Sequence, residues 1–107
     1  MAVDFEAVNR IAREYAADVS RELPIDKAVL FGSYAKETAT NQSDIDICFF
    51  LSSYNGKRKV DLVAQILGVG GDKYCLAGFE PIIFKTSEIY NDNPIVKEIL
   101  TTGKDLL

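Results

Sequence analysis

The segment that decides the fold is FGSYAKETATNQSDID, which occupies residues 31–46. It joins two apolar runs, residues 27–31 and 44–51, each of which has the length and composition of a buried strand. A Gly-Ser pair ends the first strand, and a polar loop at residues 40–43 precedes the second. A connection this short cannot hold a full crossover helix, so we expect antiparallel strands within a mixed sheet.

The residues before this segment predict one long helix. Asp4 is a suitable N-cap, and Pro24 is a stop signal. Between them, apolar side chains recur at spacings of three and four, as expected for a helix with one buried side. These residues are Phe5, Val8, Ala12, Tyr15, Ala16, Val19 and Leu23.

The residues after it predict two more helices and a third strand. One helix follows the basic residues 57–59, and the glycine-rich residues 68–71 end it. Its expected apolar stripe is Val60, Val63, Ala64 and Leu67. Residues 79–84 form the third strand, and a last helix runs from an Asn-Pro start at residue 93 to Gly103.

This order of elements predicts a single α/β domain over residues 1–107. We expect a two-layer arrangement in which helices pack on one small mixed sheet. A chain of 107 residues has room for one hydrophobic core, so a multidomain enzyme and a repeat array are excluded.

The turn after the first strand has features of a phosphate site. Gly32 allows a ligand to approach the backbone closely, because glycine has no Cβ. Ser33 is expected to cap a short helix over residues 34–38, and the free N–H groups at such a helix start favour an anion.

Carboxylates lie close to this turn. Asp44 and Asp46 are two positions apart on a strand, so both side chains leave the same face. Glu80, at the start of the third strand, joins them if that strand lies beside the second. Clustered carboxylates repel one another unless a cation neutralises them, and hard oxygen ligands suit Mg²⁺ together with substrate phosphates. The sequence therefore predicts metal-assisted phosphoryl or nucleotidyl transfer.

Other stretches offer alternatives. Asp61 and Asp72 are rival third carboxylates, but they fall on a predicted helix and in a glycine-rich turn. Residues 68–73 follow a helix rather than a strand and have the spacing of neither phosphate-loop motif, so we interpret them as a helix stop. Tyr34 is either a stacking surface for a base or a residue packed under the turn.

Composition excludes several classes of function. The chain has 12 basic and 16 acidic residues, a net charge of −4, which disfavours binding to an extended nucleic acid. It has no histidine, so a histidine-based triad and a histidine-ligated zinc site are excluded. Cys48 and Cys75 are expected to be small buried residues. No apolar run is long enough for a membrane span, and we predict a cytoplasmic location.

In the Gly-Ser turn and the acidic residues after it, the sequence resembles the polymerase-β-type nucleotidyltransferase superfamily. The match is Gly32-Ser33, ten further residues and then Asp44-Ile45-Asp46, with Glu80 and the apolar residues after it as weaker support. The size and the run GSYAK…SDIDI are most similar to the minimal nucleotidyltransferases, which are often partnered with a HEPN-domain toxin. Two departures are Glu37, where glycine is common, and Glu80, where aspartate is common.

This resemblance implies the polymerase-β-like nucleotidyltransferase fold and a magnesium-dependent reaction. A nucleoside monophosphate would pass from an NTP, with ATP as the default, to a hydroxyl. Asp44, Asp46 and Glu80 would be the catalytic residues and would hold two Mg²⁺ ions, with Glu80 taking the hydroxyl proton. The nucleotide-binding residues would be Gly32, Ser33, Tyr34, Asp44 and Asp46.

The resemblance also implies a partner. We expect the chain to be too short to build an acceptor site of its own, so the acceptor would be a tyrosine of a HEPN-domain toxin. The chain would then be the antitoxin within a hetero-oligomer. Two alternatives stay open: a non-catalytic module that masks its partner, and an oligomeric nucleotidyltransferase that modifies a small molecule such as an antibiotic.

Overall fold

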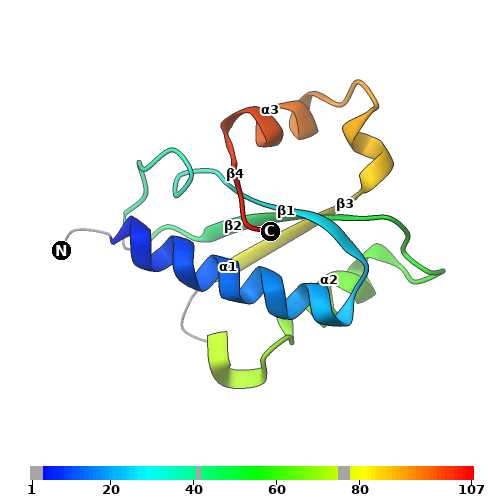
Figure 1. The fold of residues 1–107 in the computed structure, drawn as a ribbon, viewed down its shortest axis with the longest axis horizontal. Helices are drawn as coiled ribbons and strands as arrows, with labels where there is room; N and C mark the ends of the chain where they lie inside the picture. The colour runs from blue at the N-terminus through cyan, green and yellow to red at the C-terminus, as the bar shows by residue number, and fades with distance from the viewer. Residues whose placement is uncertain (1–3, 41, 75–77) are drawn as a thin grey trace.

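The structure is a computed structural model that describes residues 4–40, 42–74 and 78–107, so Asn41 of the predicted loop and Cys75 lie outside the described residues. Within these ranges the α-helices are α1 (Phe5–Glu22), α2 (Lys59–Leu67) and α3 (Pro94–Thr102). The strands are β1 (Ile25–Phe31), β2 (Ile45–Leu51), β3 (Phe79–Lys85) and β4 (Lys104–Asp105). They form one sheet in the order β3-β2-β1-β4 (Figure 1).

The sheet is mixed, as the short connection between its first two strands predicts. β1 and β2 are antiparallel with Phe31 opposite Asp46, whereas β2 and β3 are parallel with Asp46 opposite Glu80. The third strand therefore lies beside the second, which was the condition for Glu80 to join the aspartates. The pairing of β4 with β1 through Lys104 was not predicted, because a two-residue strand leaves no pattern in the sequence.

The two faces of the sheet are covered by different helices. On one face, Ile45, Ile47 and Phe49 of β2 join the core formed with α1 and α2. On the other face, Cys48 and Phe50 pack with residues of α3. Successive residues of β2 thus alternate between the two faces, and α3 adds a partial third layer opposite α1 (Figure 1).

The predicted long helix is confirmed as α1. Asp4 Oδ1 accepts a hydrogen bond from the backbone N–H of Ala7 at 3.0 Å, and the helix ends two residues before Pro24. Tyr15 anchors it, because the hydroxyl donates to the Ile66 carbonyl at 2.5 Å and the ring stacks on Phe79.

No described helix combines the length and apolar character that crossing a bilayer requires.

The predicted apolar stripe of α2 is wrong except at Val63, which is partly buried and packs against the core. The buried side of this helix carries Leu62 and Ile66, and Val69 continues it beyond the helix. By contrast, Val60 and Leu67 of the predicted stripe are 64% and 55% exposed. Apolar residues lie on more than one side of this short helix, so the packing partners rather than the periodicity decide which side is buried.

α3 is fixed at both ends by the predicted signals. Asn93 Oδ1 accepts hydrogen bonds from the backbone N–H groups of Ile95 and Val96, and the helix ends at Gly103. A Cβ at position 103 would lie 2.3 Å from Val29 Cγ1. Glycine therefore lets the end of α3 pass directly over β1, on the same face of the sheet as Asp46.

Candidate active site

The turn after β1 lies directly against the side chain of Asp46. Gly32 follows Phe31, the cross-strand neighbour of Asp46, and has a φ of +73°, a conformation in which side chains are unfavourable. A Cβ at this position would lie 2.4 Å from Asp46 Oδ2. The predicted phosphate turn and one predicted metal ligand are therefore in direct contact, and only glycine leaves room for both.

Three carboxylates share one end of the sheet. Asp46 and Glu80 are register neighbours on β2 and β3, and Asp44 precedes β2 by one residue. Partial burial raises the pKa of Asp46, and the nearby charges of Glu80 and Asp44 raise it further. Among the described residues, none of the three forms an ion pair with a lysine or arginine. Their negative charge is therefore uncompensated by the described part of the protein.

The chemistry of this donor set fits a magnesium ion. Carboxylate oxygens are hard ligands, and Mg²⁺ in phosphate-transfer sites takes one or two of them and completes its shell with substrate phosphates and water. In the described part of the chain, no three acidic or cysteine side chains form a group that could hold a metal ion. The fit to Mg²⁺ rests on the hard oxygen atoms of these carboxylates and on the further ligands that substrate phosphates and water supply in such sites.

The predicted short helix over residues 34–38 is absent, and the segment forms consecutive turns instead. The carbonyl of Gly32 accepts from the N–H of Lys36 at 3.1 Å, and the carbonyl of Ser33 accepts from the N–H of Thr38 at 2.9 Å. Glu37 has a φ of +58°, which no α-helix accommodates. Ser33 thus closes a turn and caps no helix, so any phosphate would meet the start of a turn and not a helix dipole.

A comparison with known protein families identifies the family of a chain with this arrangement. The family model described as "Nucleotidyltransferase domain" matches residues 12–103, which include the Gly32 turn and all three carboxylates. The chain belongs to the nucleotidyltransferase domain family. A search of curated proteins finds no significant match.

Solved structures support the fold of this nucleotidyltransferase domain. A provisionally assigned nucleotidyltransferase from Sulfolobus solfataricus superposes with a TM-score of 0.65 and 18% identity, covering 94% of this chain and 80% of that one. A chain of a toxin–antitoxin complex with AMP-PNP superposes with a TM-score of 0.59 and 17% identity, covering 89% of this chain and 72% of that one. At these identities the likeness concerns the fold alone.

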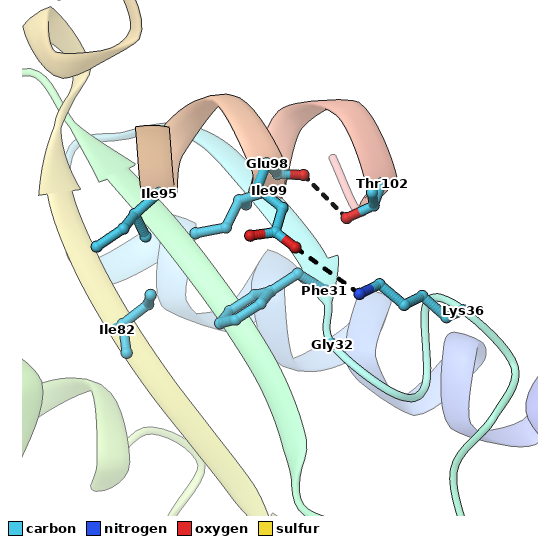
Figure 2. Close-up of a pocket in the computed structure, with 8 residues that line it drawn as sticks. All are labelled: Phe31, Gly32, Lys36, Ile82, Ile95, Glu98, Ile99 and Thr102. Atoms are coloured by element: carbon cyan, nitrogen blue, oxygen red, sulfur yellow. Dashed lines mark hydrogen bonds and ion pairs between the residues drawn. The ribbon is translucent and has the colours of Figure 1, made fainter. Parts of the chain in front are cut away.

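One further candidate residue of the nucleotidyltransferase domain was not singled out from the sequence. Lys36 is the only basic residue within 31–46, and it borders the same cavity as Gly32. Its Nζ lies 3.9 Å from Glu98 Oε1 of α3 (Figure 2). The sequence did contain a signal, because Lys36 is the single basic residue of this segment. A cation in a turn beside carboxylates is suited to the negative charge of a phosphate.

Tyr34 is the predicted nucleotide-binding residue that the structure does not bring to this face. Its side chain is buried in the core on the opposite side of the sheet, where its ring and that of Phe5 are T-shaped. The hydroxyl donates to the carbonyl of Thr40 at 3.3 Å. Of the two interpretations that the sequence left open, this position matches packing under the turn, and the ring offers no surface beside Asp46.

The rival carboxylates occupy other parts of the nucleotidyltransferase domain. Asp61 lies on α2 and pairs with Arg58 at 2.9 Å. Asp72 lies in the 3-10 segment Gly71–Tyr74, in the turns that follow α2. Glu80 is the acidic residue that the sheet register places next to Asp46.

Proposed function

We propose that this domain transfers a nucleoside monophosphate from an NTP, with ATP as the default, to a hydroxyl. The observation that carries the proposal is the contact between Asp46 and the Gly32 turn, with Glu80 in register beside Asp46. Such an arrangement can hold a triphosphate on the turn while its α-phosphate faces the carboxylates.

Asp44, Asp46 and Glu80 would hold Mg²⁺. Magnesium, when bound, supplies charge that neutralises the triphosphate and acidifies the acceptor hydroxyl. Gly32 and Ser33 bind the β- and γ-phosphates through the start of the turn, and Lys36 adds a positive charge there. The acceptor oxygen bonds to the α-phosphorus, its proton passes to Glu80, and the bond to the β-phosphate breaks to release pyrophosphate.

We further propose that the acceptor is a tyrosine hydroxyl on a HEPN-domain toxin and that this domain acts as its antitoxin. Two observations support this partner. The motif from Gly32 to Asp46 resembles that of the minimal nucleotidyltransferases, and one structural neighbour is a chain of a toxin–antitoxin complex with AMP-PNP. The assembly would then be a hetero-oligomer.

The test incubates the purified chain and its candidate partner with ATP labelled at the α-phosphate and with MgCl₂. We expect labelled partner with the wild-type chain and none with the Asp44→Ala, Asp46→Ala double variant. Asp61→Ala and Asp72→Ala are matched controls that should keep the reaction, because these carboxylates lie away from Asp46. An unlabelled partner, or labelling that survives the double variant, would contradict the proposal.

A non-catalytic masking module is the second candidate, and one observation favours it. The turn that would hold the phosphates closes through Glu37 in a left-handed conformation, where related sequences commonly have glycine. Calorimetry separates the two candidates. Tight binding of the partner without any heat from ATP and MgCl₂ would favour the masking module.

A further inference from the structure

A cavity lies beside the carboxylates, between the sheet and α3. Its volume is about 230 Å³, and its walls are largely apolar. Figure 2 shows the side chains of Ile82 and Phe31 on the sheet side and those of Ile95 and Ile99 on the α3 side. The polar side chains of Lys36, Glu98 and Thr102 also line it.

The cavity adjoins the candidate active site and shares two residues with it. Gly32 and Lys36 belong to both, because the turn that touches Asp46 also borders the cavity. On β3, Ile82 lies two residues after Glu80 and therefore on the same face. A molecule with its phosphates on the turn would thus have an apolar space available to the part beyond its phosphates.

The lining suits a flat ring. Phe31 is only partly buried, and Ile95 is 59% exposed although it is a large apolar side chain. Covering such surface with an aromatic base removes apolar area from water, which favours binding. Ligand sites commonly combine apolar walls of this kind with a few polar groups that fix orientation.

Two of the polar side chains of the cavity, Lys36 and Glu98, form an ion pair. Lys36 Nζ and Glu98 Oε1 are 3.9 Å apart, and their side chains are 49% and 69% exposed. An exposed pair at this separation contributes little to stability. If Lys36 turns towards a triphosphate, Glu98 becomes available to accept a hydrogen bond from the bound molecule.

We propose that this cavity takes the nucleoside part of the NTP and that Glu98 accepts a hydrogen bond from an N–H or O–H donor of that nucleoside. The donor is either an exocyclic amino group of the base or a ribose hydroxyl. The proposal rests on the proposed nucleotidyl transfer, since it assumes a triphosphate on the Gly32 turn. It adds which part of the domain contacts the nucleoside and which residue selects it.

The first experiment blocks the cavity without touching the turn. Thr102 lines the cavity and Thr101 does not, although each is an exposed threonine whose hydroxyl donates to a carbonyl four residues earlier. Thr102→Trp should weaken ATP binding about tenfold or more, whereas Thr101→Trp should leave it unchanged. Inorganic tripolyphosphate with MgCl₂ should bind wild type and both variants alike, because it has no nucleoside.

These two ligands separate the possible failures. If both tryptophan variants bind ATP as the wild type does while tripolyphosphate still binds, the nucleoside proposal is overturned and the proposed function stands. If the wild-type chain binds neither ATP nor tripolyphosphate, both proposals fall. Tripolyphosphate binding by Thr102→Trp also shows that this variant is folded.

The second experiment tests Glu98 by comparing ATP, ITP and 2′-deoxyATP. ITP lacks the exocyclic amino group of ATP, and 2′-deoxyATP lacks one ribose hydroxyl. We expect wild type to prefer ATP over one of these analogues and Glu98→Ala to lose that preference. Asp61→Ala removes a carboxylate that is ion-paired on another helix and should keep the preference. Equal selectivity in wild type and Glu98→Ala would overturn the role of Glu98.

Discussion

Gly32 and Asp46 are in contact so close that a single methyl group at position 32 would overlap the aspartate carboxylate, at 2.4 Å from Oδ2. The two residues come from the facing ends of β1 and β2, whose register places Phe31 opposite Asp46. One backbone position thus serves the turn and the acidic end of the sheet together. The fold links the two halves of the sequence motif by strand pairing, without any further residue between them.

This contact predicts that Gly32→Ala is more harmful than strain alone explains. Gly56 is a matched control, because its φ of +78° resembles the +73° of Gly32 but no atom lies within 4 Å of its Cβ position. Gly56→Ala should lower the free energy of unfolding by about 1–2 kcal/mol. Gly32→Ala should lower it further and also weaken tripolyphosphate binding, as measured by urea unfolding and calorimetry. Equal losses in the two variants would show that the Asp46 contact is easily relieved.

The partial burial of Asp46, together with its acidic neighbours, predicts that neutralising Asp46 stabilises the metal-free protein. The pKa of Asp46 is raised in the folded state by burial and by its acidic neighbours. Its contribution therefore favours folding at low pH and is lost as the pH rises through the folded-state pKa. In EDTA, Asp46→Asn should be more stable than wild type at neutral pH, and the difference should vanish below the usual aspartate range.

Urea unfolding across this pH range measures the effect, and added MgCl₂ supplies its control. Magnesium should raise the melting temperature of wild type, because a ligand that binds only the folded state stabilises it, and should have little effect on Asp46→Asn. Asp61→Asn, which loses an exposed carboxylate paired with Arg58, should respond to magnesium as wild type does. A metal-free Asp46→Asn protein less stable than wild type at neutral pH would show that burial and acidic neighbours do not destabilise the charged carboxylate.

The elements with strong local signals could be predicted from the sequence. Asp4 and Pro24 delimit α1, and an Asn-Pro start delimits α3, because capping is decided by residues adjacent in the chain. The position of Glu80 beside Asp46 could be predicted only if β3 was assumed to lie beside β2. Which strands are neighbours is not specified by any local pattern in the sequence.

The features that could not be predicted depend on contacts between distant parts of the chain. Lys36 meets Glu98 across 62 positions, so no local window contains both residues. The cavity is lined by residues of β1, β3 and α3, which lie far apart in the chain. In the turn, Glu37 adopts a positive φ, which a short helix over residues 34–38 cannot contain.

The positive φ of Glu37 predicts a stabilising substitution. Its φ is +58°, in the left-handed region, where a residue with a side chain costs about 1 kcal/mol or more. Glu37→Gly should raise the free energy of unfolding by about 0.5–1 kcal/mol, because relief of strain exceeds the added entropy of the unfolded chain. Asn55, also exposed and with a φ of +52°, is the matched control, since asparagine tolerates this region.

Urea unfolding of the two glycine variants measures this difference. Asn55→Gly should change stability by less than Glu37→Gly does, with either sign. If Glu37→Gly destabilises the chain, the Glu37 side chain makes a compensating interaction in the turn. The same variant tests the masking module, because binding of ATP that appears only with glycine at position 37 would mean that the wild-type turn is closed to phosphate.

Cys48 is predicted to be unreactive in the folded protein although it lies on the face that carries Asp46 and Glu80. It is fully buried between β1 and β3, and burial raises the pKa of its thiol to about 12. The thiolate is the reactive form, so alkylation requires both exposure and deprotonation. In a Cys75→Ser background, where Cys48 is the only cysteine, iodoacetamide should label the native chain far more slowly than the chain in urea.

The labelling rate should follow the opening of the sheet, since β2 lies between two other strands and opens only when the core does. A Ser52→Cys variant, further substituted with alanine at Cys48 in the same background, supplies an exposed thiol just past the end of β2 as the reference. Adding ATP and MgCl₂ should slow the labelling of Cys48 further if nucleotide binding stabilises the folded state. Labelling of native Cys48 at the rate of the exposed reference would mean that α3 leaves this face readily, and the cavity beneath it would then lack a fixed wall.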